Sequence, residues 1–136
     1  DHKKLMNILK KRLKDKKIHP DLVLSSPAER ALSTCQIIAE KVGYTNAINT
    51  DQRLYHASEE DLLAVVHKLN DANDEVMIFS HNPGLTDFAN RLNKKTFTDN
   101  VPTCGVVAIN FLVDSWKEVQ WGKGAVVFFD YPKKNQ

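Results

Sequence analysis

Arg30 and His81 are the residues of this sequence whose types and positions best suit the binding of a phosphate group. Arg30 lies in segment 25–31, Ser-Ser-Pro-Ala-Glu-Arg-Ala, and His81 lies in segment 80–85, Ser-His-Asn-Pro-Gly-Leu. A planar guanidinium holds two phosphoryl oxygens at once, and a protonated imidazole donates a hydrogen bond to another. Taken alone, Arg30 would more often be a surface arginine near carboxylates, and His81 would more often be a histidine bonded to neighbouring backbone. Their occurrence at equivalent places in the chain favours one shared phosphate site.

Both motifs follow short apolar runs that predict buried strands. Residues 22–24 and 76–79 are continuously apolar, which is typical of strands covered on both faces of a parallel sheet. The carboxyl ends of parallel strands meet at one edge of the sheet, where ligands bind. We therefore expect Arg30 and His81 to face the same crevice, with Arg30 in a first helical turn that favours an anion.

The helix after the first motif is well marked. Ser26 is a candidate N-cap, Pro27 suits the first helical position and Glu29 completes a capping box, while Gly43 suits the end. The inward stripe of this helix contains a cysteine, which we interpret as a core residue rather than a nucleophile. That stripe consists of Ala31, Cys35, Ile38 and Val42.

The middle of the chain continues the alternation of strands and helices. A weak strand is expected at 47–50, a helix capped by Ser58 with Asp61 follows it, and Pro83 opens a third helix. Glu59, Glu60 and Asp61 crowd the positive end of the second helix. We interpret them as compensation of the helix dipole rather than as catalytic groups.

The two ends of the chain carry different patterns. Extended runs at 106–113, 118–121 and 125–129 with short connections predict antiparallel strands. Apolar residues at helical spacing predict an amphipathic helix near the start, with the stripe Leu5, Ile8, Leu9 and Leu13. The whole pattern predicts one domain, residues 1–136, built as a three-layer α/β sandwich whose central sheet is mostly parallel with an antiparallel flank.

Composition narrows the class of protein. The 136 residues carry a net charge of only +2, so nucleic acid is not expected as a partner. No apolar run approaches the roughly 20 residues of a membrane helix, so no membrane partner is expected either. Cys35 and Cys104 show neither metal-ligand spacing nor a disulfide framework. We expect no metal, no cofactor, a monomer and a cytoplasmic setting.

With these motifs in place, the sequence resembles the histidine phosphatase superfamily, and within it the small bacterial phosphohistidine phosphatases of the SixA type. The resemblance spans almost the whole chain and rests on four motifs in this order: residues 20–31 with Thr34, residues 54–57 (Leu-Tyr-His-Ala), residues 80–85 and residues 101–105 (Val-Pro-Thr-Cys-Gly). It implies a phosphoglycerate-mutase-like fold. It also implies dephosphorylation in two in-line steps through a phosphohistidine enzyme intermediate, without a metal.

The resemblance also assigns roles to single residues. Arg30 matches one of two family arginines that hold phosphoryl oxygens, and His81 matches the second histidine, which stabilises the transition state. The other arginine and the nucleophilic histidine belong to an Arg-His-Gly or Arg-His-Ala turn after an opening strand, and neither turn occurs in this sequence. His2 has no strand before it and is rejected as a substitute. We therefore expect a domain that lacks its first strand and catalytic turn, and hydrolysis should fail if the protein begins at Asp1.

Three further residues are candidates for substrate binding. Many larger relatives place a glutamate acid shortly after the Arg-Leu that resembles residues 53–54, whereas this sequence continues with Tyr55 and His56. His56 either lines the pocket, as acid or substrate contact, or is an exposed loop histidine. Asn82 either caps the following helix or turns its amide toward the phosphate. Thr103 resembles the family loop that closes the pocket and would offer a hydroxyl or a backbone N–H.

Three function hypotheses follow. The first is a phosphohistidine phosphatase that acts on a signalling protein, such as a histidine-containing phosphotransfer domain, and releases inorganic phosphate; the easily protonated leaving nitrogen and the short loops favour it. The second is a phosphatase of the same superfamily that acts on small phosphate esters. The third is a non-catalytic phosphate- or phosphoprotein-binding module. A cysteine hydrolase that uses Cys104 with His81 is a remote fourth, because no third orienting residue is evident.

Overall fold

The computed structural model describes residues 4–9, 18–101 and 106–130, and it contains one sheet of six strands in the order β3-β2-β4-β1-β5-β6. Pairing is parallel between β1 and β4, β2 and β4, and β2 and β3, whereas β5 runs antiparallel to β1 and β6 antiparallel to β5. The predicted mostly parallel sheet with an antiparallel flank is confirmed. The strands are β1 (Lys4–Leu9), β2 (Leu22–Ser25), β3 (Asn49–Thr50), β4 (Glu75–Phe79), β5 (Val106–Phe111) and β6 (Ala125–Asp130).

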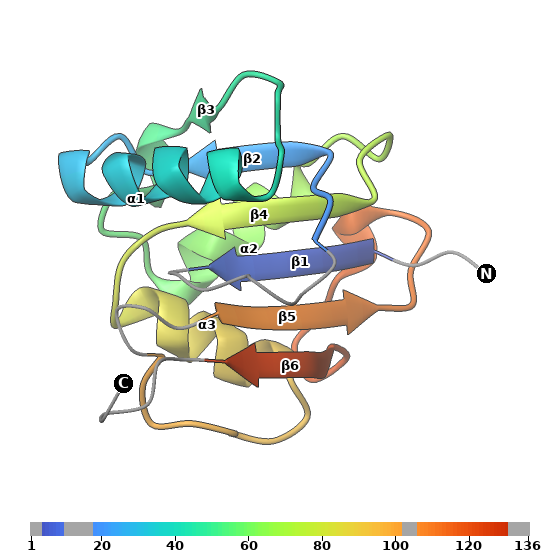
Figure 1. The fold of residues 1–136 in the computed structure, drawn as a ribbon. Coiled ribbons are helices and arrows are strands. Elements are labelled where there is room, and N and C mark those ends of the chain that lie inside the picture. Colours follow the sequence, from blue (N-terminus) through green and yellow to red (C-terminus); the bar gives the residue numbers. More distant parts are fainter. Residues whose placement is uncertain (1–3, 10–17, 102–105, 131–136) are drawn as a thin grey trace.

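Helices cover both faces of this sheet, with α1 (Glu29–Lys41) on one side and α2 (Glu59–His67) and α3 (Gly84–Leu92) on the other (Figure 1). The alternation of side chains along β4 reflects these layers. Val76 and Ile78 belong to the hydrophobic cluster that includes α2 and α3, whereas Met77 and Phe79 pack with the buried apolar residues of α1. Because successive strand residues point to opposite faces, β4 contributes to both cores, and the predicted three-layer sandwich is confirmed.

The predicted helix near the start of the chain is wrong, because Lys4–Leu9 forms β1 at the centre of the sheet. Over so short a length, the apolar residues of this segment fit the spacing of a strand as well as that of a helix. Strand pairing decides in favour of the strand, because β1 bonds β4 on one side and β5 on the other. Without β1, both β4 and β5 would present an unpaired edge. The sequence after β1 contains no Arg-His-Gly or Arg-His-Ala turn. The expectation that this domain lacks the first strand and the catalytic turn of the family stays a prediction.

A second correction concerns residues 118–121, which form no strand. A short 3₁₀ helix, η2 (Trp116–Glu118), lies there instead, with a capping box between Ser115 and Glu118. The Trp116 side chain is fully buried, and its indole donates a hydrogen bond to the backbone carbonyl of Asn73. Burial of one large aromatic side chain outweighs the weak strand propensity of this segment.

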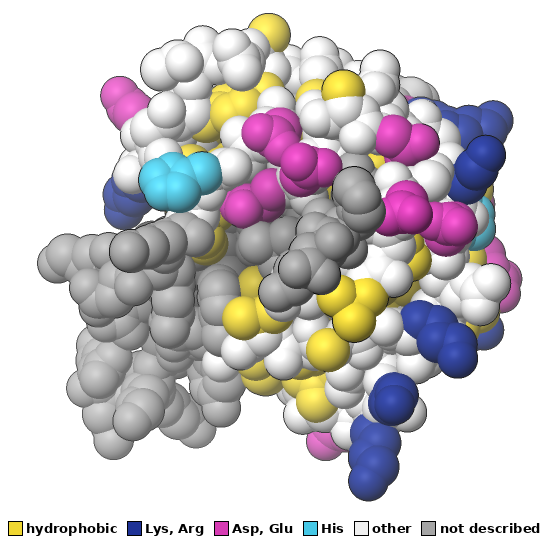
Figure 2. All heavy atoms as spheres, turned by 90° about the vertical axis from the view of Figure 1, so that its right-hand side faces the viewer, with side chains coloured by type: hydrophobic (Ala, Val, Ile, Leu, Met, Phe, Trp, Pro, Cys, Tyr) yellow, Lys and Arg dark blue, Asp and Glu magenta, His cyan; other side chains and the backbone are white. Residues whose placement is uncertain are grey.

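Acidic side chains gather on the face at the amino ends of the parallel strands (Figure 2). Asp21 accepts hydrogen bonds from the backbone N–H groups of Asp74 and Glu75, and Asp71 accepts from Ser115 and Trp116. These carboxylates therefore hold loops together. Their charge makes this face unfavourable for an anion.

Among residues 4–9, 18–101 and 106–130, the model shows no helix with the length and apolarity needed to cross a membrane.

Candidate functional site

The two motifs predicted to share a crevice lie side by side. Ser25 at the end of β2 pairs with Phe79 at the end of β4, so Ser26 and His81 leave the sheet as neighbours. His81 Nε2 lies 2.8 Å from Ser26 Oγ. The imidazole is therefore held at the carboxyl edge of the sheet, and its half-buried position leaves it partly accessible to a ligand.

Ser26 joins His81 to the start of α1. Its Oγ also accepts a hydrogen bond from the backbone N–H of Ala28 at 3.2 Å, and the Ser26 side chain is fully buried. The helical N-cap position itself is Ala28, without a side-chain cap, so the sequence prediction placed the cap two residues early. The physical reason is that Ser26 Oγ serves both the helix start and a histidine from another strand.

Arg30 lies in the first turn of α1, exposed to solvent. Among residues 4–9, 18–101 and 106–130, the arginines that form ion pairs are Arg53, with Asp51, and Arg91, with Glu59 and Glu60. Among those residues, Arg30 is thus not a surface arginine neutralised by a carboxylate. A positive guanidinium beside free N–H groups at a helix start suits an anion.

The connection between η1 (Gln52–Leu54) and α2 brings two aromatic rings to His81. The rings of Tyr55 and His56 stack with centroids 4.2 Å apart and planes 16° from parallel. Each ring also meets His81 edge-on, with both centroid distances at 5.9 Å. The structure thus places His56 at the candidate site, beside a tyrosine that sequence reasoning did not single out.

Asn82 bonds to the start of α3 from the residue before the N-cap, which is Pro83, and its amide is not free. Its Oδ1 accepts hydrogen bonds from the backbone N–H and the hydroxyl of Thr86, at 3.2 and 2.8 Å. Its Nδ2 donates to the carbonyl of Val101 at 2.8 Å. Both ends of the side chain are engaged in tying α3 to the segment that leads toward residue 102. Thr103 and Cys104 lie outside the described residues.

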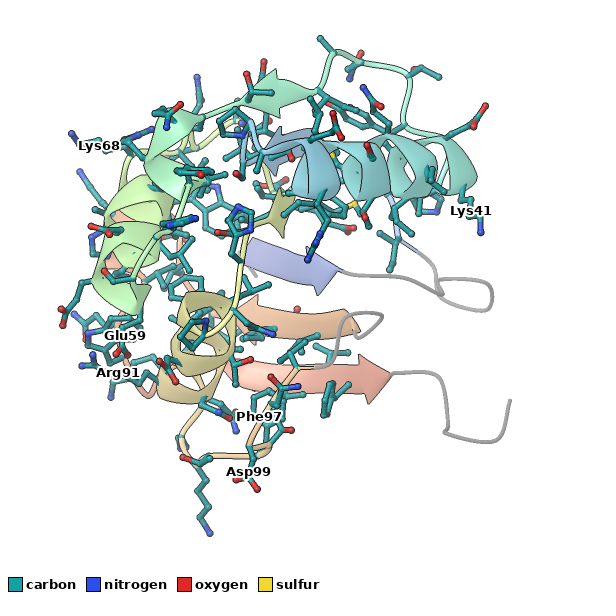
Figure 3. The ribbon with its side chains drawn as sticks, turned by 90° about the vertical axis from the view of Figure 1, so that its left-hand side faces the viewer. Lys41, Glu59, Lys68, Arg91, Phe97 and Asp99 are labelled. Atoms are coloured by element: carbon teal, nitrogen blue, oxygen red, sulfur yellow. The ribbon has the colours of Figure 1, made fainter. Side chains whose placement is uncertain are left out.

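The acidic start of α2 is also structural. Ser58 and Asp61 form the predicted capping box, and hydrogen bonds with the backbone and side chain of Ser58 lower the pKa of the Asp61 carboxyl. Glu59 and Glu60 bond to Arg91, which comes from the end of α3 (Figure 3). The Arg91 guanidinium also lies 4.1 Å from the ring centroid of Trp121. These contacts hold α2 and α3 together.

Cys35 is a core residue, as predicted. Its side chain is fully buried in the cluster between α1 and the sheet. Burial raises the pKa of the thiol to about 12, against a smaller lowering by a hydrogen bond with Ser25. Within the described part of the chain, no three histidine, cysteine or acidic residues are grouped so that they could hold a metal ion.

Comparison with known proteins shows which solved structures share this fold. No protein-family model matches the chain, and no curated protein matches it by sequence. A structure described as a candidate phosphohistidine phosphatase SixA from Nakamurella multipartitia superposes with a TM-score of 0.79 at 12% identity, covering 97% of this chain and 98% of that one. The chain has the histidine phosphatase fold. The resemblance inferred from the sequence motifs is therefore matched in three dimensions.

Two other solved structures show the same fold. A candidate phosphohistidine phosphatase SixA from Agrobacterium tumefaciens gives a TM-score of 0.74 at 17% identity over 96% of this chain and 98% of that chain. The protein histidine phosphatase SixA complexed with tungstate gives 0.69 at 18% identity over 88% of this chain and 73% of that chain. At such low identities the likeness concerns the fold, and the site must be argued from this chain's own residues.

Proposed function

We propose that this protein is a phosphatase that removes phosphate from a phosphorylated histidine of a signalling protein, through a phosphohistidine enzyme intermediate. The observation that carries the proposal is the contact between His81 and Ser26, because it joins a histidine to the helix start that bears Arg30, within a histidine phosphatase fold. The proposed partner is a phosphorylated protein such as a histidine-containing phosphotransfer domain, and the proposed setting is the cytoplasm.

In this mechanism Arg30 binds two phosphoryl oxygens, and protonated His81 donates a hydrogen bond to the charge that builds up during transfer. Ser26 keeps the imidazole in place. The attacking histidine of the family belongs to a turn that the printed sequence does not contain. Binding and turnover must therefore be measured separately.

The binding test uses tungstate and inorganic phosphate as probes. Arg30→Ala and His81→Ala should each weaken the affinity about tenfold or more, because each removes a charge-assisted hydrogen bond. Arg53→Ala is the matched control, since the model pairs its guanidinium with Asp51, and its affinity should stay unchanged. Unaltered affinity in both site variants would exclude the phosphate site.

The turnover test compares a phosphohistidine peptide with a phosphoserine peptide and a small phosphate ester. Faster release of phosphate from phosphohistidine supports the proposed substrate. Faster release from the small ester supports the second hypothesis, an ester phosphatase. Binding of phosphate without turnover of any substrate supports the third hypothesis, a non-catalytic phosphate- or phosphoprotein-binding module.

A further inference from the structure

Tyr55 and His56 form a rigid pair of stacked rings beside the candidate phosphate site. Their planes lie within 16° of each other, and both rings stand edge-on to the imidazole of His81. Tyr55 is 46% exposed although it is one of the larger apolar side chains. An exposed aromatic surface next to an anion site is a suitable contact for the part of a ligand that carries the phosphoryl group.

The backbone on both sides of these rings is clamped to the segment that carries His81. Before them, the carbonyl of buried Leu54 accepts a hydrogen bond of 2.8 Å from Ser80 Oγ. After them, the carbonyl of Ala57 lies so close to Gly84 that a Cβ on residue 84 would overlap it. The backbone that carries the two rings is therefore held against the segment of His81.

His56 has a backbone conformation that supports the same conclusion. Its φ is +52°, in the left-handed region, and the model gives no other described residue except glycine a positive φ. Such a conformation persists only where the surroundings hold it, and it occurs preferentially at functional sites. Here the clamped connection holds it, with the result that the imidazole stacks on Tyr55.

We infer that Tyr55 and His56 form an aromatic wall that stacks against the ring bearing the phosphoryl group, so that the site selects phosphoryl groups carried by planar rings over those carried by aliphatic chains. This deepens the proposed function and rests on its phosphate site. In phosphohistidine and in phosphotyrosine the phosphoryl group is carried by a planar ring, an imidazole or a phenyl ring. In phosphoserine it is carried by an aliphatic side chain, which cannot stack.

The test measures the affinity of the full chain for phenylphosphonate and for cyclohexylphosphonate, which have rings of similar size but different planarity. We expect phenylphosphonate to bind about fivefold more tightly, as is typical of one stacked aromatic contact. Tyr55→Leu should abolish this preference. Tyr44→Leu is the matched control, because Tyr44 lies beyond the far end of α1 with its hydroxyl bonded to Ala47, and it should retain the preference.

A second arm compares kcat/KM for phosphohistidine, phosphotyrosine and phosphoserine peptides. Faster turnover of either aromatic substrate than of phosphoserine, lost in Tyr55→Leu, supports the wall and tells the two rings apart. Phenylphosphonate preference without any turnover would support the wall while the proposed catalysis fails. Turnover of phosphohistidine with equal affinity for the two phosphonates would overturn the wall while the proposed catalysis stands. Failure of both phosphonates to bind would overturn the wall.

Discussion

The imidazole of His81 and the hydroxyl of Ser26 meet at 2.8 Å, although one follows β4 and the other follows β2. Since Ser26 Oγ also accepts the Ala28 N–H, one buried hydroxyl sets the position of the histidine relative to the helix that carries Arg30. The geometry of the candidate site therefore depends on a residue that need not touch the substrate.

Replacement of this hydroxyl should disturb His81 directly. Ser26→Ala should destabilise the protein by about 2 kcal/mol, because it removes two partly buried hydrogen bonds of about 1 kcal/mol each, and should shift the ring nitrogen resonances of His81 in NMR spectra. Ser25→Ala is the matched control: Ser25 is equally buried, but its hydroxyl donates to the Ser26 carbonyl. That variant should lose stability without a change in the His81 signals. Unchanged His81 signals in Ser26→Ala would contradict the positioning role.

Gly84→Ala should be destabilising. In an ordinary helix this change gains roughly 1 kcal/mol, but here the added Cβ would overlap the carbonyl of Ala57, and overpacking should cost about 3 kcal/mol. Gly43→Ala is a useful comparison because the model shows no atom within 4 Å of a Cβ there and only the positive φ of 78° opposes it, at about 1 kcal/mol. Denaturant unfolding of both variants measures the difference. A stabilised Gly84→Ala would exclude the clamp.

The strain at His56 gives a second test with two paired variants. His56→Gly and His56→Ala both remove the imidazole, but only alanine keeps a Cβ in the left-handed conformation. The glycine variant should therefore be more stable than the alanine variant by about 1 kcal/mol, as measured by denaturant unfolding. Equal stabilities would mean that the backbone relaxes and that the connection is not rigid.

The pair of Asp51 and Arg53 should make a small pH-dependent contribution to stability. The Arg53 guanidinium, bonded through Nε and Nη2, lowers the pKa of the Asp51 carboxyl. Because the folded pKa lies below the unfolded value of about 3.9, the contribution is present above that pH and is lost as the pH falls through the folded pKa. Arg53 is half exposed, so the contribution should be less than about 1 kcal/mol.

Urea unfolding of the native protein and of Asp51→Asn as a function of pH measures this contribution. The two free energies of unfolding should differ near pH 6 and converge as the pH falls below about 4. Asparagine keeps a side-chain oxygen for the Arg53 backbone N–H but loses both the charge and the second oxygen that accepts from the guanidinium. A difference that grows on acidification would contradict the assigned sign.

Much of the scaffold was predictable from local pattern. The apolar runs before Ser26 and His81 predicted β2 and β4, and the capping box of Ser58 and Asp61 predicted the start of α2. In each case the local propensity and the tertiary environment agree. The meeting of the two motifs at one edge followed from the parallel order of the strands.

The remainder depends on contacts between distant residues. Lys4–Leu9 has helical spacing, yet it pairs with strands from the middle and the end of the chain. Trp116 draws its segment into the core against Asn73. The contact between Ser26 and His81 and the stacking of Tyr55 on His56 likewise arise only in three dimensions, although two adjacent serines at a buried strand end were a usable signal.

The central position of β1 has a consequence for how the protein assembles during synthesis. Leu5 pairs with Glu75 on one side and with Asn110 on the other, so β1 leaves the ribosome long before either neighbour. Once β4 has emerged, β1 and β2 can both pair with it, but the other edge of β1 remains open until β5 follows. Contacts of such sequence separation slow folding, and unpaired strand edges invite association with other chains. The nascent chain should therefore need protection until β5 has emerged.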